Sequence, residues 1–236
     1  MKVSRATVGR FQVRLSFSTD EIDDACLEAL SKGGFLPTTP APIRVERFVE
    51  KFFQCNAGYE NLPIGTMGYS LFDGKGKVIE VRVSDKLEDG KQSSERRVRS
   101  TWAHEAGHCL LHPLLFIETP GQPTFSQTEG KSCNIEGRKI LCRDNDIKPA
   151  GRSYDGRWWE WQANRCIGGL LLPKKLVREA LSMILVDSVV TRSPTIPPAR
   201  RLEAEKCVAS IFDVNPVVAR IRLAEMYPDP KGQIEF

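Results

Sequence analysis

The stretch STWAHEAGHCLLH, residues 100–112, holds all three histidines of a 236-residue chain. They are His104, His108 and His112, spaced four positions apart, and Glu105 follows the first of them. On an α-helix, side chains four positions apart lie on one face, about one turn from each other. We therefore expect this stretch to be a helix with a row of imidazoles along one face.

His104, Glu105 and His108 form the pattern HExxH. Two imidazoles one turn apart can bind a single zinc ion, at about 2.0–2.1 Å each. Glu105 is rotated by about 100° from His104, so we expect it beside the metal, where it can take a proton from an activated water. The alternative is a surface helix with two solvated histidines and an unrelated acid.

A catalytic zinc site uses three protein ligands and leaves a fourth position open. The best candidate for the third ligand is Glu160, in the segment WWEWQANRC. Glu160, Ala163 and Asn164 fall on one face of the expected helix, and the rest of that face is apolar. A carboxylate on a buried face is costly unless it is paired or bound to a metal. The alternatives are that Glu160 pairs with Arg157 or points into solvent.

Four residues near this constellation are candidates for supporting roles. Asn164 would hold a histidine ligand through its other ring nitrogen, or make a plain interhelical hydrogen bond. His112 is expected to contact a ligand or the helix end, because three residues of one straight helix cannot all reach the same ion. Tyr154 and Arg157 are interpreted as loop anchors, with support of the transition state as the alternative.

Small residues would let the two metal-binding helices approach closely. They are Ala106 and Gly107 in the first helix and Ala163 in the second. Because glycine inside a helix costs about 1 kcal/mol relative to alanine, we expect Gly107 to have a packing role.

HEAGHCLLH followed by EWQANRCIGGLLLP resembles the ImmA/IrrE family of metallopeptidases, over roughly residues 43–173. The resemblance implies a reduced thermolysin-like (gluzincin-type) core, with His104, His108 and Glu160 as zinc ligands and Glu105 as general base. It also implies an endopeptidase that cleaves helix-turn-helix repressors in stress, phage or mobile-element regulation.

The chain departs from the family pattern in two places. Cys166-Ile167 stands where the family usually has Phe-Ala, which concerns packing more than chemistry. Glu160 lies 52 residues after His108, and this distance indicates an insertion at about 117–157. An insertion there affects how a substrate reaches the site, not which residues bind the metal.

The insertion contains Cys133 and Cys142. We expect them to face each other across a hairpin as two reduced thiols. No histidine is free to complete a second metal site, so we assign them no metal.

Hydrophobic periodicity predicts an α+β fold with a small sheet. Strands are expected at 66–72 and 77–84, joined as a hairpin through DGKG. The second strand would flank the cleft and could pair with an extended substrate along a free edge. The alternative is an ordinary strand with both edges covered. Helices are expected at about 18–34, 43–55, 94–112, 158–172 and 174–186.

We divide the chain into an N-terminal helical extension (1–40), a metallopeptidase domain (41–185) and a C-terminal helical segment (186–236). The last segment reads as two helices around a tight turn, similar to a helix-turn-helix. No base-reading cluster opens its second helix, so a packing or partner surface is favoured over DNA binding. In that helix Val217, Val218, Ile221 and Ala224 are expected to face inward, and Arg220 and Arg222 outward.

Composition narrows the class of protein. A net charge of +4 is too mild to indicate a nucleic-acid partner. The first twenty residues lack the apolar run of a secretory signal, and no segment is apolar enough to span a bilayer. Seven scattered cysteines favour reduced thiols. We therefore expect a cytoplasmic protein without a membrane partner.

The expected function is that of a zinc-dependent endopeptidase that cleaves a regulatory, repressor-type protein. One alternative is a non-catalytic binding module that uses the same fold to sequester a partner protein. The other is a DNA-binding regulator that acts through its C-terminal helix pair.

Overall fold

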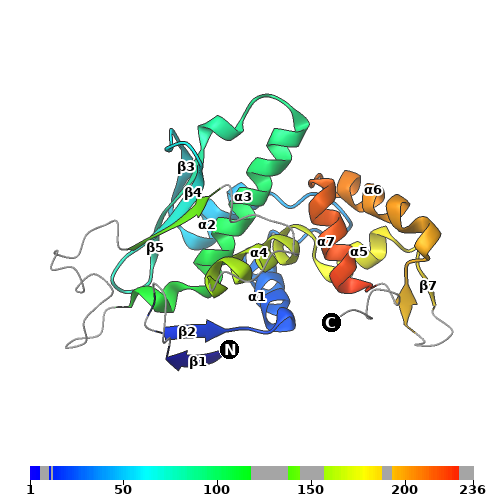
Figure 1. Ribbon diagram of the computed structural model, residues 1–236, viewed down its shortest axis with the longest axis horizontal. Helices are drawn as coiled ribbons and strands as arrows, with labels where there is room; N and C mark the ends of the chain where they lie inside the picture. Colours follow the sequence, from blue (N-terminus) through cyan, green and yellow to red (C-terminus); the bar gives the residue numbers. More distant parts are fainter. Residues whose placement is uncertain (6–10, 12, 118–137, 144–156, 188–192, 229–236) are drawn as a thin grey trace.

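The computed structural model describes residues 1–5, 11, 13–117, 138–143, 157–187 and 193–228. Within these ranges the chain has the mixed α+β character that its periodicity predicts (Figure 1). The α-helices are α1 (Thr19–Lys32), α2 (Val45–Phe53), α3 (Gln92–Leu111), α4 (Trp158–Leu171), α5 (Lys174–Ala180), α6 (Arg201–Ile211) and α7 (Pro216–Met226). The strands are β1 (Lys2–Arg5), β2 (Val13–Ser16), β3 (Asn56–Glu60), β4 (Thr66–Phe72), β5 (Val78–Ser84), β6 (Lys139–Arg143), β7 (Val186–Asp187) and β8 (Pro194–Thr195).

The main sheet has four strands in the order β3-β5-β4-β6. The predicted hairpin is present as the antiparallel pair of β4 and β5. On its other side β5 pairs in parallel with β3, so the expectation that this strand offers a free edge to a substrate is wrong. The polar segment that forms β3 had the composition of a loop. Its backbone nevertheless supplies the hydrogen bonds that the second edge of β5 requires.

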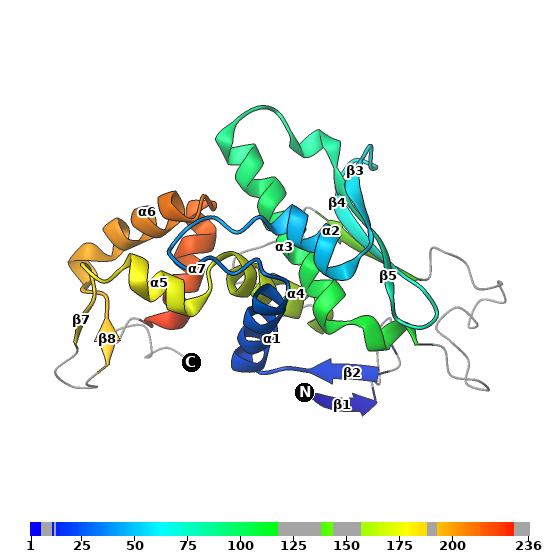
Figure 2. The ribbon, with the colours of Figure 1, turned by 180° about the vertical axis from the view of Figure 1, so that it is seen from behind.

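Helix α3 lies at the centre of the molecule. The sheet packs on one side of it, and α4 and the C-terminal helices lie on the other, in both views (Figures 1 and 2). Every residue from 100 to 109 is buried. The HExxH segment is therefore part of the core, and the alternative of a surface helix with solvated histidines is excluded.

Helices α3 and α4 approach closely at Gly107, as their small residues predict. A Cβ atom at Gly107 would lie 2.7 Å from Cβ of Cys166 and 3.0 Å from Cα of Ala163. No side chain fits in that space without moving one of the helices. The glycine thus sets the short interhelical distance that brings the side chains of α3 and α4 together.

The N-terminal part packs on the back of α4. Ser18 caps α1 in a capping box with Glu21. The helix lies against α4, where a Cβ at Gly169 would come within 2.8 Å of Sγ of Cys26. Strands β1 and β2 form a short antiparallel hairpin that we did not predict, although Val13 and Leu15 of β2 alternate with polar residues. Most residues of the two strands are exposed.

The C-terminal helices α6 and α7 are present as predicted, but the expected inner face of α7 is wrong. Arg222 is buried, whereas Val217 and Ala224 are exposed. The Arg222 guanidinium donates to the backbone oxygen of Leu172 (3.0 Å) and forms an ion pair with Asp23 (2.7 Å). A charge pair, which an apolar pattern cannot reveal, sets the rotation of this helix. Among the described residues, no helix has the length and apolar character needed to cross a bilayer.

Candidate metal centre

Two side chains of α3, His104 and His108, converge with Glu160 of α4, which lies 52 residues after His108. The Nε2 atoms of His104 and His108 lie 3.0 Å apart. Oε2 of Glu160 lies 3.1 Å from the first nitrogen and 3.5 Å from the second. Atoms that bind one tetrahedral zinc ion at about 2.1 Å lie roughly 3.4 Å from each other. These three residues therefore have the spacing of a set that can hold a metal ion.

Charge around this cluster favours a cation. Burial alone would raise the pKa of Glu160, but the imidazoles of His108 and His104 hold it well below its usual range. Burial alone would lower the pKa of His104, but its contacts with Cys142 and Glu160 raise it well above the usual imidazole value. The two shifts mean that Glu160 is charged and that His104 holds its proton in the absence of a metal, so a metal ion would displace that proton.

A chain of hydrogen bonds orients His108. Gln162 donates from Nε2 to the backbone oxygen of Leu15 (2.7 Å), so its Oε1 faces His112 as an acceptor. His112 is neutral, because burial and the neighbouring His108 lower its pKa to about 3. Its Nε2–H donates to Gln162 over 2.9 Å, and its Nδ1 is left as an acceptor.

The N–H at Nδ1 of His108 then donates to Nδ1 of His112 (3.0 Å). Nε2 of His108 consequently carries the lone pair, and it is this nitrogen that faces Glu160. His112 thus lies beside a candidate ligand and not at the metal position. The ring of His112 also packs edge-on against Trp158, with 5.7 Å between the ring centroids. This contact helps to keep water away from the chain of hydrogen bonds.

Asn164 has the corresponding position at the other histidine. Its Oδ1 lies 3.0 Å from Nδ1 of His104 and accepts that N–H. Nε2 of His104 is then the nitrogen that faces Glu160 and His108. A partner on the distal nitrogen of a ligating histidine fixes both the tautomer and the ring orientation.

Glu105 points toward strand β4, and one of its carboxylate oxygens lies within 4.8 Å of a nitrogen of His104. Its Oε2 accepts a hydrogen bond of 2.6 Å from Oγ of Ser70, and both residues are fully buried. A Cβ atom at Gly68 would lie 3.0 Å from Oε1 of Glu105. Strand β4 therefore provides a hydrogen-bond donor, Ser70, and leaves space for the carboxylate at Gly68, which has no side chain.

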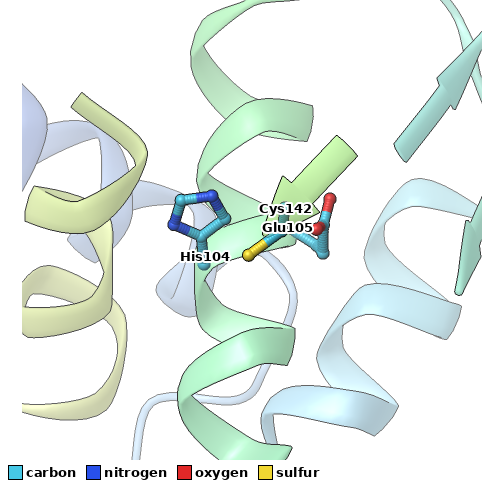
Figure 3. A group of neighbouring side chains, drawn as sticks. All are labelled: His104, Glu105 and Cys142. Carbon is cyan, nitrogen blue, oxygen red and sulfur yellow. The ribbon is translucent and has the colours of Figure 1, made fainter. Parts of the chain in front are cut away.

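Cys142 of β6 reaches the same place. Its Sγ, a nitrogen of His104 and a carboxylate oxygen of Glu105 all lie within 4.8 Å of one another. Figure 3 shows the sulfur directed into the space between His104 and Glu105. Burial raises the pKa of the Cys142 thiol to about 11, while the charge and hydrogen bond of His104 lower it.

Cys142, to which the sequence assigned no metal, therefore lies in a group of residues that could hold an ion. Cys142 lies on the buried face of β6, and that face packs against α3. Its expected neighbour Cys133 lies outside the described residues.

The remaining candidates lie at the start of α4. Tyr154 is outside the described residues. Arg157 is the N-cap residue of the helix, and its backbone oxygen accepts the N–H of Glu160 (3.1 Å). Glu160 itself is only 6% exposed, so the alternative in which it points into solvent is excluded.

Three residues of the cluster were not identified from the sequence as part of it. Ser70 is a polar residue in an otherwise apolar strand, and Gln162 is a polar residue beside a predicted ligand. Neither residue can be assigned to the cluster until its partner is known, which is Glu105 for Ser70 and His112 for Gln162. Cys142 had no sign at all, because strand pairing alone brings it to α3.

No protein-family model matches this chain, and no curated protein matches it. The positions of His104, His108 and Glu160 relative to one another are therefore the basis for assigning a function.

Proposed function

We propose that the chain is a zinc-dependent endopeptidase of the ImmA/IrrE type, built on a reduced gluzincin-like core. The observation that carries the proposal is the triangle of Nε2 of His104, Nε2 of His108 and Oε2 of Glu160, with sides of 3.0, 3.1 and 3.5 Å. Two histidines and one glutamate form a donor set that zinc accepts in catalytic sites.

The three ligands are held before any ion arrives. Asn164 and His112 accept the distal N–H groups of the two imidazoles, so Nε2 is the nitrogen of each ring that would bind a metal. A zinc ion, when bound there, supplies a Lewis acid that activates water for attack on a peptide carbonyl.

Glu105 is the proposed general base. Ser70 donates to Oε2 of this carboxylate and stabilises its charged form. Glu105 accepts the proton of the attacking water and afterwards delivers it to the leaving amine of the cleaved bond. Burial of the carboxylate against β4 excludes bulk water from this transfer.

The substrate class follows from the resemblance of the HExxH and EWQAN segments to the ImmA/IrrE family. We propose site-specific cleavage of a regulatory protein of the helix-turn-helix repressor type. The described cysteines are free thiols, which agrees with a cytoplasmic location for such a substrate.

A second function, a binding module that sequesters a partner without cleaving it, is favoured by one observation. His104, Glu105 and His108 are all 0% exposed, and a peptide cannot reach them without some opening of the site.

The test compares the wild-type protein with Glu105→Gln and Glu160→Gln. Zinc content and cleavage of purified repressor proteins are both measured. We expect one zinc per chain in the wild type and in Glu105→Gln, reduced zinc in Glu160→Gln, and cleavage by the wild type alone. If the wild type binds zinc but its proteolysis equals that of Glu105→Gln, the binding module is the correct function.

A further inference from the structure

Strand β6 pairs with one edge of β4 and ends the main sheet on that side. It comes from the insertion between the HExxH helix and Glu160, so the inserted segment returns to the metal centre. Ile140 and Cys142 alternate with more exposed neighbours and are both 0% exposed. The inner face of the strand thus directs Ile140 into the core and Cys142 toward α3.

The pairing of β4 and β6 has an irregularity next to Cys142. Thr66 is opposite Arg143 and Gly68 is opposite Cys142, so Met67 is an extra residue in the ladder. A bulge of this kind bends the strand and redirects the neighbouring side chains.

Gly68, the cross-strand partner of Cys142, has no side chain to fill the space beside Glu105. A Cβ atom at that position would meet Oε1 of Glu105 at 3.0 Å. The cysteine sulfur and the glutamate carboxylate therefore face the same small region without a barrier between them.

We propose that Cys142 is a fourth protein ligand of the metal held by His104, His108 and Glu160, and that the resting site is closed by this thiolate. The inference rests on the metal centre proposed above. His104 belongs to both groups that could hold a metal, one with His108 and Glu160 and the other with Glu105 and Cys142. Cys142 is not a member of the first group, so its side chain has to rotate from the position beside His104 before the sulfur reaches the same ion.

Ligation exchanges the S–H bond of Cys142 for a sulfur–metal bond, without a change in oxidation state. The proton leaves to the Glu105 carboxylate, whose oxygen lies within 4.8 Å of Sγ, and then to solvent. Four protein ligands are typical of closed zinc sites, whereas a catalytic site keeps one position for water. Cleavage by the wild type is consequently limited to the molecules in which Cys142 has moved away from the metal, so the activity of the wild type is reduced and not absent.

The position of β6 supports this closed state. The strand covers the edge of β4 that β5 leaves open, and Nζ of Lys139 lies 4.0 Å from the ring centroid of Tyr69. An extended substrate could use the same edge, so the inserted strand excludes both the substrate backbone from β4 and water from the metal.

The experiment uses full-length protein whose metal has been exchanged for Co²⁺, together with X-ray absorption of the zinc form. We expect wild-type protein to show thiolate-to-cobalt charge-transfer absorption in the near ultraviolet, and one sulfur at about 2.3 Å from zinc. Cys142→Ala should lose both features, keep one metal per chain, and cleave the substrate faster than the wild type. Cys26→Ala, which removes an equally buried thiol from α1, is the matched control and should keep both features.

The outcomes separate the two proposals. One metal per wild-type chain without a sulfur ligand overturns the role of Cys142 and leaves the three-ligand centre intact. A wild-type protein that binds no metal overturns the centre itself. The X-ray absorption of wild-type protein decides the question even if Cys142→Ala fails to fold.

Discussion

Nε2 of His112 lies 2.9 Å from Oε1 of Gln162, and this contact determines which nitrogen of His108 faces the metal position. Gln162 is itself oriented by the backbone oxygen of Leu15 in β2. The N-terminal hairpin is therefore connected to the centre through three successive hydrogen bonds. Residues outside the triangle of His104, His108 and Glu160 thus control the tautomer of one of its members.

Gln162→Leu removes the acceptor for the N–H of His112. The neutral His112 can then turn or change tautomer, and His108 loses its fixed orientation. We expect zinc affinity to fall about 10–100-fold, as measured by competition with a chelating dye. Gln162→Glu keeps an acceptor and should retain most of the affinity. Equal zinc affinity of the Gln162→Leu variant and the wild type would show that this chain of hydrogen bonds has no effect on metal binding.

Ser70→Ala removes the donor to Glu105 and should leave zinc content unchanged. Loss of a hydrogen bond to a carboxylate raises its pKa. The acid limb of the pH profile of kcat/KM should therefore move to higher pH. Cys109→Ala, which removes a weaker contact to the same hydroxyl (3.6 Å), is the control. An unchanged acid limb in Ser70→Ala would contradict the role of this hydroxyl.

Gly107→Ala should destabilise the protein even though alanine is the better helix former. The new methyl group would overlap Cβ of Cys166, at 2.7 Å. Overpacking of this kind costs about 1–3 kcal/mol, measured as the free energy of unfolding in urea. Gly168→Ala meets only the side chain of Arg222, at 3.2 Å, and should cost less. A neutral Gly107→Ala would mean that α3 and α4 can separate freely.

Asp23 makes stability depend on pH. Burial alone would raise its pKa, but Arg222 and Lys174 lower it below the usual value. The stabilisation of the folded state by charged Asp23 is therefore complete above the unfolded-state pKa of about 3.9. It is lost as the pH falls through the lower folded-state pKa. Asp23→Asn should be about 3 kcal/mol less stable than the wild type at pH 7.

That difference between Asp23→Asn and the wild type should shrink below about pH 4, in urea unfolding measured from pH 7 to pH 3. Asp20→Asn is the matched control. Asp20 contacts the same lysine (2.9 Å) but its side chain is 85% exposed, so the change should have little effect. A stability difference that does not vary with pH would argue against a charged Asp23 in the folded state.

The sequence by itself determined the helices of the centre and the side chains on their faces. The spacing of His104, His108, Glu160 and Asn164 requires only the helical period, and the small residues at Gly107 and Ala163 predicted a close approach. The β4–β5 hairpin also followed from local alternation and a glycine-containing turn. All of these are properties of neighbouring residues.

Tertiary structure alone decided the contacts between segments that are far apart in the chain. β3 covers the edge of β5 although its sequence is polar, Arg222 turns inward because Asp23 of α1 meets it, and β6 carries Cys142 to the histidines. Strand pairing depends on backbone groups that every residue has, and a buried ion pair depends on a partner in another element. Neither leaves a periodic pattern in the sequence, and so the position of Cys142 beside His104 could be found only once the chain was folded.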